Sequence, residues 1–141
     1  MNQKLKKAII ICMSKLEQKP AQKSGIRLMQ SREATGNKII AKALTEFKAE
    51  LRRIYGQRLK QVILYGSYAR GSARADSDLD LAVVLKGKVK PGKEIDRMLD
   101  AVVEMNLNYQ VLISVYPVSE QDFLFRKSPL LMNIHKEGAR I

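Results

Sequence analysis

The chain is poor in several residue types, and each shortage excludes a class of protein. Cys12 is the single cysteine among 141 residues, so neither an intrachain disulfide nor a cysteine-based zinc site can form. Tryptophan is absent and aromatic residues make up only 6% of the chain, so the composition does not support a base-stacking surface for nucleic acids. No apolar run approaches the roughly 20 residues that cross a membrane. The single cysteine favours a reducing compartment, so the expected location is cytoplasmic. The shortness of the apolar runs leads us to expect no membrane partner.

Positive charge, by contrast, is in excess. The formal net charge is +12 at pH 7, which favours a polyanionic partner or substrate such as nucleic acid, a triphosphate or an acidic protein. Residues 1–38 hold nine basic and two acidic side chains, and hence +7 of that charge. Two interpretations of this segment stay open: a solvated basic arm, or a surface that contacts nucleic acid or an acidic partner. A lysine-rich turn over residues 86–93 leaves a similar choice between a solvated loop and contact with phosphates.

Apolar periodicity divides the chain into two parts. Residues 3–18 carry apolar side chains at helical spacing and predict an amphipathic helix. Residues 20–36 combine proline, glycine, serine and charges without a period, which indicates a linker. A second amphipathic helix is predicted over residues 37–55. We therefore expect a basic N-terminal helix and linker over residues 1–36 and one folded domain over residues 37–141.

Within the expected domain, strands and helices alternate. Apolar runs predict strands over residues 61–65, 79–85 and 109–116, and a helix that ends near residue 107 precedes the third strand. Two short helices are expected after that strand. Their signals are a capping pair at Ser119 and Asp122, Pro129 in a first turn, His135 in a last turn and Gly138 at the end. The pattern predicts an α/β (α+β) fold with a small mixed β-sheet packed against helices.

The most informative pattern in the chain is a Gly-Ser pair that is followed, after ten intervening residues, by Asp-x-Asp. Gly66 directly follows a predicted strand, and glycine permits both a sharp turn and the close approach of a phosphate. A short helix that begins at Ser67 would direct free N–H groups at an anion. Arg70 lies three residues further, on the same face of that helix. Together these residues predict a phosphate-binding turn.

The two aspartates form the second half of the pattern. Residues i and i+2 of a strand share a face, so Asp78 and Asp80 direct both carboxylates the same way. Such carboxylates repel each other unless a cation lies between them, and Mg²⁺ suits them because it bridges carboxylates to phosphates. Asp76 lies in the turn and is interpreted as solvated or capping. Either half alone is common in turns, but the combination between two strands indicates a nucleotide or phosphate site.

At these residues the chain resembles a known family. Segment 62–85 is similar to the core motif of the minimal nucleotidyltransferases, a branch of the DNA polymerase β superfamily, and a weaker likeness extends over residues 38–141. The resemblance implies a small mixed sheet packed against helices. It also implies transfer of a nucleoside monophosphate from an NTP, in particular ATP, to a hydroxyl with Mg²⁺. The implied roles are nucleotide binding by Gly66, Ser67 and Arg70, and metal binding and catalysis by Asp78 and Asp80.

The chain departs from the family pattern at one point. Active relatives carry a third metal-binding carboxylate on a later strand, beside the strand that bears Asp-x-Asp. The matching strand is predicted here over residues 109–116 and contains no acid. Its residues Gln110, Leu112 and Ser114 would share one face. The nearest acids in the sequence are Glu104, Glu120 and Asp122.

Two functions follow from this comparison. The first is a Mg²⁺-dependent nucleotidyltransferase that moves AMP from ATP to a hydroxyl of a partner protein or RNA. So short a chain leaves little room for a separate acceptor-binding domain. The resemblance then implies a small helical partner of the HEPN type and the role of antitoxin in a toxin–antitoxin pair. The second function is a nucleotide-binding domain without turnover, which acts by binding a partner protein or nucleic acid.

Overall fold

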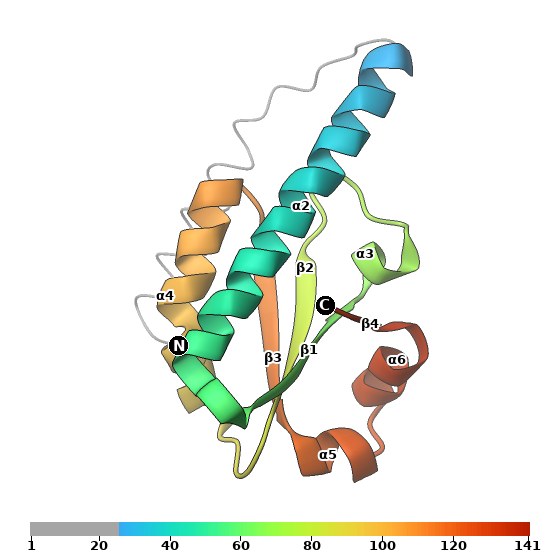
Figure 1. Ribbon diagram of the computed structural model, residues 1–141. Helices are drawn as coiled ribbons and strands as arrows, with labels where there is room; N and C mark the ends of the chain where they lie inside the picture. Colours follow the sequence, from blue (N-terminus) through green and yellow to red (C-terminus); the bar gives the residue numbers. More distant parts are fainter. Residues whose placement is uncertain (1–25) are drawn as a thin grey trace.

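A four-stranded sheet in the order β3-β2-β1-β4 forms the centre of the fold (Figure 1). The structure is a computed structural model that describes residues 26–141, with side chains from residue 37; the helix expected over residues 3–18 lies outside this range. The strands are β1 (Leu59–Tyr65), β2 (Leu79–Leu85), β3 (Ile113–Ser119) and β4 (Ala139–Arg140). The helices are α2 (Ile26–Tyr55), the 3-10 helix η1 (Gly56–Arg58), α3 (Ser67–Arg70), α4 (Pro91–Tyr109), α5 (Glu120–Phe125) and α6 (Pro129–Glu137).

The strand β2 holds the layers of the fold together. It pairs antiparallel with β1 and parallel with β3, so the sheet is mixed and the predicted fold class is confirmed. Every residue from Leu81 to Leu85 is fully buried, as a continuous apolar run requires when both faces of a strand are covered. Its odd-numbered side chains pack against α2 and α4, and the even-numbered Ala82 and Val84 pack against α5 and α6. Figure 1 shows α2 and α4 side by side on one face of the sheet.

The helix α2 begins earlier than the sequence predicted. A linker was expected over residues 20–36, whereas the described part of that segment is helical from Ile26. The residues before Gly36 are mostly strong helix formers, and one internal glycine costs about 1 kcal/mol relative to alanine, which a long helix tolerates. The predicted inward face is correct; its buried residues are Ala43, Leu44, Phe47 and Leu51. None of the helices in the described residues is long and apolar enough to cross a membrane.

The third strand differs from the prediction over residues 109–116. Helix α4 continues to Tyr109, and Gln110 ends it in the left-handed region at φ 52°, so β3 begins only at Ile113. The strand also continues through Pro117 to Ser119, beyond its predicted end at residue 116. Because β3 is an edge strand, the missing N–H of proline need not interrupt a ladder. Consequently Gln110 and Leu112 lie before the strand, and the face predicted to hold Gln110, Leu112 and Ser114 does not form.

Serine caps begin the two C-terminal helices; the cap at Ser119 was predicted and the cap at Ser128 was not. The Ser119 hydroxyl accepts a hydrogen bond from the backbone N–H of Asp122 at 3.0 Å. The Ser128 hydroxyl accepts one from the backbone N–H of Leu131 at 3.2 Å. Pro129 occupies the first turn of α6, where its lack of an N–H costs nothing. Each cap satisfies a donor that the helix itself leaves free.

His135 lies in the last turn of α6, as predicted, and joins that helix to α5. Its Nε2 lies 2.7 Å from the carbonyl oxygen of Phe123. The two rings lie with their centroids 4.3 Å apart. These contacts explain the position of His135 without a catalytic role.

Candidate functional site

The predicted phosphate-binding turn lies where β1 ends and β2 begins. Tyr65, the last residue of β1, pairs with Asp80 near the start of β2. Gly66 follows, and α3 begins at Ser67, as the sequence predicted. Figure 1 shows α3 next to the end of β1. The antiparallel pairing therefore brings the Gly-Ser turn to the aspartates, although ten residues separate Ser67 from Asp78.

Two independent constraints require glycine at position 66. Gly66 has φ 75° and ψ −152°, a conformation that residues with a side chain rarely adopt. A Cβ at this position would also overlap Oδ2 of Asp80 and would lie 3.3 Å from its Cγ. The backbone of the turn thus touches the carboxylate directly. A phosphate at the turn and a cation at the carboxylate would share one small volume.

Asp78 and Asp80 both have raised pKa values. Burial is the main cause in each case; the charge of Asp76 adds to it at Asp78, and the charge of Asp78 adds to it at Asp80. Arg70 acts in the opposite direction and lowers the pKa of Asp80. Asp80 is partly buried and Asp78 is exposed, and two neighbouring carboxylates that repel each other are suited to hold one divalent cation.

Arg70 is held by an acidic residue that the sequence did not single out. Its Nη1 lies 2.9 Å from Oε1 of Glu137 in α6, and half of the Arg70 side chain is exposed. An ion pair this exposed contributes at most about 1 kcal/mol, so a phosphate oxygen can replace Glu137. The pair ties the turn to the last helix and keeps a guanidinium beside the carboxylates.

Ser77 closes the loop between α3 and β2. Its hydroxyl accepts a hydrogen bond from the backbone N–H of Arg74 at 2.7 Å, and its own N–H donates to the carbonyl of Arg74 at 3.0 Å. Asp76 lies within this closed turn and is exposed, as the sequence predicted. This turn leads directly into β2, and Asp78 is the last residue before the strand.

Among the described residues, β3 and the helices beside it add no third carboxylate to the pair. In the parallel register of β2 and β3, Ser114 lies opposite Asp80. Glu120 and Asp122 follow the C-terminal end of β3, at the far end of β2, and Glu104 belongs to α4, which covers the other face. The acids that the sequence offered as nearest therefore lie away from the pair. Among the described side chains, no group of three or more His, Cys, Asp or Glu could hold a metal ion.

Two tyrosines near the carboxylates were missed in the sequence. Tyr65 lies directly opposite Asp80, and Tyr116 lies two residues beyond Ser114 on the same face of the sheet. Burial raises the pKa of Tyr65, and the charges of Asp80 and Tyr116 raise it further. Strand alternation could have placed Tyr65 on this face. Tyr116 required the register of β3, which the sequence placed wrongly.

The chain belongs to the nucleotidyltransferase domain family. Residues 44–136 match the family described as "Nucleotidyltransferase domain". A protein of Methanocaldococcus jannaschii, named "Putative protein adenylyltransferase MJ0604", is 38% identical over 82 residues, which are 58% of this chain and 76% of the relative. A second protein of that organism, "Putative protein adenylyltransferase MJ1305", is 36% identical over 101 residues, which are 69% of this chain and 67% of the relative. Family and relatives together support an enzyme.

Solved structures are similar at a lower level. A chain from the "Crystal structure of the toxin-antitoxin with AMP-PNP" has 16% identity and a TM-score of 0.49, with 67% of this chain and 69% of that chain covered. A nucleotidyltransferase, named as putative, from Sulfolobus solfataricus has 19% identity and a TM-score of 0.40, with 85% and 90% covered. The family assignment comes from the sequence relatives and not from these structures.

The two constraints on Gly66 predict that alanine costs more stability at position 66 than at position 71. Gly66→Ala meets both an unfavourable φ and the Asp80 carboxylate, so we expect the free energy of unfolding to fall by about 2–4 kcal/mol. Gly71→Ala is the matched control, since Gly71 has φ 72° with open space around its Cα. It should cost only about 1 kcal/mol. Urea denaturation of both variants measures the difference, and equal losses would show that the Gly66–Asp80 contact is unimportant.

The raised pKa of Asp80 predicts that Asp80→Asn raises the melting temperature by an amount that depends on pH. Because the pKa of Asp80 is higher in the folded protein than in the unfolded chain, protonation of Asp80 favours folding. This contribution to the free energy of unfolding is fully present below the unfolded pKa and is lost as the pH rises through the folded pKa. In metal-free buffer at pH 7, Asp80→Asn should therefore raise the melting temperature by about 1–4 °C, and the gain should vanish near pH 4. Thermal unfolding across this range tests the expectation, with exposed Asp100→Asn as the control. A destabilised Asp80→Asn at pH 7 would contradict it.

Proposed function

We propose that the protein is a Mg²⁺-dependent nucleotidyltransferase that moves AMP from ATP to a hydroxyl of a partner protein or RNA. The contact between the Gly66 backbone and the Asp80 carboxylate carries this proposal, because it joins a phosphate-binding turn to a pair of carboxylates. Membership of the nucleotidyltransferase domain family supports the reaction class. The names of the relatives, protein adenylyltransferases, favour ATP as donor and a protein as acceptor.

Each site residue has a distinct part in this proposal. Gly66 and Ser67 would bind the triphosphate through backbone N–H groups and the serine hydroxyl, and Arg70 would leave Glu137 for a phosphate oxygen. Asp78 and Asp80 would hold the metal and are the proposed catalytic residues. A divalent cation held by these two carboxylates would supply positive charge that offsets the charge developing on the reacting oxygens. The protein itself contributes mainly positioning and fixed charge.

The names of the relatives also bear on the acceptor. Because those relatives are named as protein adenylyltransferases, we propose that the acceptor hydroxyl lies on a partner protein. We further propose a small helical protein of the HEPN type, with this chain as the antitoxin of the pair. RNA is the other proposed acceptor, and the basic residues 1–38 would contact it. The proposed location of the protein is the cytoplasm.

A second function, binding without turnover, is favoured by Ser114. The side chain opposite Asp80 is a hydroxyl where active relatives are expected to supply a third carboxylate. Two carboxylates and a triphosphate can hold one cation firmly, but a two-metal arrangement requires more acidic ligands. In this case the domain would bind ATP and a partner without transferring AMP.

A label-transfer experiment separates the two functions. The protein is incubated with ATP labelled at the α-phosphate, Mg²⁺ and a lysate of its source cells. If it is a transferase, a labelled protein or RNA band appears, and Asp78→Asn and Asp80→Asn each weaken the band at least about a hundredfold, because several kcal/mol of charge stabilisation are lost. Asp76→Asn removes the same charge from the neighbouring turn and should retain the band.

The controls for this experiment fix its interpretation. Equilibrium binding of Mg²⁺–ATP is measured for all variants and the unmodified chain. ATP binding without any band would overturn the transferase and leave the binding role. A band of equal strength in the Asp80→Asn variant would assign the activity to another residue or to a contaminant.

Replacement of Ser114 tests the significance of the missing carboxylate. Ser114→Asp places a third acid opposite Asp80, and we expect Mn²⁺ to bind about tenfold more tightly, an effect of roughly 1.4 kcal/mol. Ser114→Asn has a side chain of similar size without charge and should leave Mn²⁺ affinity unchanged. Calorimetric titration measures both variants in the absence of nucleotide. Unchanged affinity in Ser114→Asp would show that position 114 does not face the metal site.

A further inference from the structure

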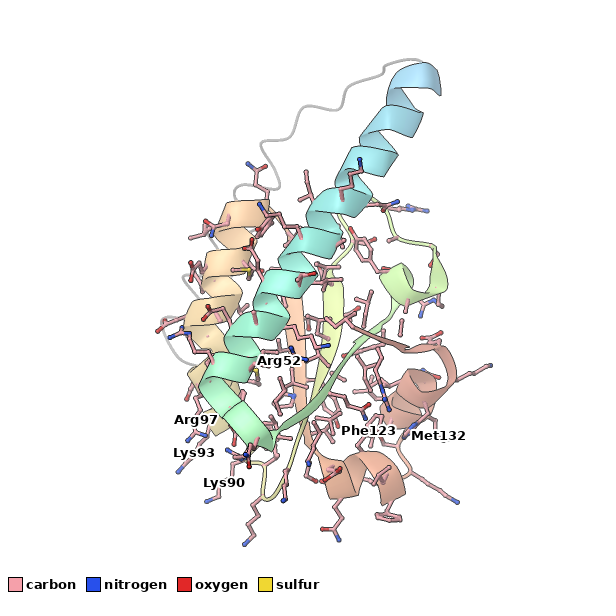
Figure 2. All side chains as sticks on the ribbon, in the orientation of Figure 1. Arg52, Lys90, Lys93, Arg97, Phe123 and Met132 are labelled. Atoms are coloured by element: carbon pink, nitrogen blue, oxygen red, sulfur yellow. The ribbon has the colours of Figure 1, made fainter. Side chains whose placement is uncertain are left out.

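Exposed cations gather at the end of the sheet opposite the candidate site. The turn from β2 into α4 and the first turns of α4 present five exposed basic side chains, which we call the cationic turn: Lys86, Lys88, Lys90, Lys93 and Arg97. Figure 2 shows Lys90, Lys93 and Arg97 together on one side of the molecule, directed to solvent. Only two acids, Glu94 and Asp96, lie between residues 86 and 97. Asp96 is the exposed one of the two.

Glu94 does not neutralise the cationic turn at its surface. The residue is 5% exposed, and its carboxylate contacts Arg58 at 3.3 Å and Arg97 at 3.5 Å. The charge of Glu94 is therefore paired within the protein, with the partly exposed Arg58 and the exposed Arg97. The N-terminus of α4 lies in the same turn and adds partial positive charge.

Arg58 holds the cationic turn in place. Its Nε donates to the carbonyl of Lys86 at 3.3 Å, and its Nη2 donates to the carbonyl of Lys88 at 3.2 Å. The backbone N–H of Lys86 donates in return to the carbonyl of Arg58 at 2.7 Å. The guanidinium also lies over the ring of Tyr55, 5.8 Å from its centroid. The lysines thus extend from a fixed backbone, which lowers the conformational entropy lost when they bind a ligand.

The cationic turn is too far away to serve the nucleotide site. Asp80 lies near the start of β2 and Lys86 directly after its end. Six residues of extended chain span about 20 Å at roughly 3.3 Å per residue. A triphosphate at Gly66 cannot reach these lysines, so their charge is available to another ligand.

The composition of the cationic turn favours a nucleic acid over a protein. Interfaces between proteins are enriched in aromatic and apolar anchors and depleted in lysine. The exposed large apolar residues of the described chain lie elsewhere; they are Ile39, Leu124, Phe125, Leu130 and Met132. Lysine and arginine without apolar neighbours are typical of contacts to phosphates.

We propose that the cationic turn binds the phosphodiester backbone of a nucleic acid, without reading its sequence. The five side chains supply point charges, and the absence of exposed aromatic residues among them leaves no base-stacking surface. Binding at this end is independent of the transferase site, since the length of β2 separates the two. It extends the functions proposed above and does not rely on residues 1–38.

The test compares two variants with equal loss of charge. Binding of the full chain to a fluorescent single-stranded RNA and to a DNA duplex is followed by anisotropy as the salt concentration rises. In the first variant four lysines of the turn are changed, Lys86→Gln, Lys88→Gln, Lys90→Gln and Lys93→Gln. We expect its salt-dependence slope to be smaller by about 3, since each phosphate contact contributes roughly 0.7–0.9, and its affinity at moderate salt to fall at least about tenfold. The matched control removes four exposed cations elsewhere, through Lys42→Gln, Arg126→Gln, Lys127→Gln and Lys136→Gln.

Each outcome supports or overturns the proposal. A large loss in the first variant and a small loss in the control supports it, and the stronger of the RNA and DNA signals names the ligand. Equal losses would show that net charge alone is responsible. Absence of binding by the unmodified chain, or tighter binding to polyglutamate than to either nucleic acid, would also overturn it. Circular dichroism of both variants checks that the fold is intact, and the label-transfer result does not affect any of these readings.

Discussion

The close approach of the Gly66 backbone to the Asp80 carboxylate is the constraint on which the candidate site depends. It exists because β1 and β2 pair antiparallel with Tyr65 opposite Asp80. That register in turn is set by β2, because its buried run of apolar residues leaves only the first residues of the strand free to carry charge. A shift of one residue would move Asp80 to the face covered by α2 and α4. The core therefore fixes the chemistry by fixing which face each side chain occupies.

The same strand separates two ends of opposite charge. At its start, Asp76, Asp78 and Asp80 repel one another, and the neighbouring Arg70 offsets this repulsion only in part. Past its end, the cationic turn projects from a backbone that Arg58 anchors. Like charges gathered at each end cost stability that the apolar core must offset. A protein selected for stability alone has no reason to keep either cluster, which is why both are interpreted as sites for ligands.

Sequence alone predicted the parts of the structure that local rules govern. The strand over residues 79–85, the turn at Gly66 and the cap at Ser119 follow from periodicity, backbone freedom and short-range hydrogen bonds, and they were correct. The failures involve competition between neighbours. The start of α2 at Ile26 depends on flanking helix formers outweighing Gly36, and the start of β3 depends on where α4 stops. The position of Ser114 beside Asp80 is a matter of tertiary register, which no local pattern contains.

The outer edge of β1 is covered by residues 139–141, which are made well after the strand itself. β4 pairs there with Ile63 and Leu64, the N–H of Ile141 donates to the carbonyl of Val62, and Glu137 holds Arg70. At about 5–20 residues per second, a ribosome takes roughly 4–15 s to add this cover after Tyr65 has been made. During that interval the nascent chain carries an open strand edge, a template for pairing with another chain. The order of synthesis thus delays completion of the candidate phosphate-binding turn until residues 137–141 have been made, and a nascent chain that stops before them keeps the open strand edge, which favours aggregation.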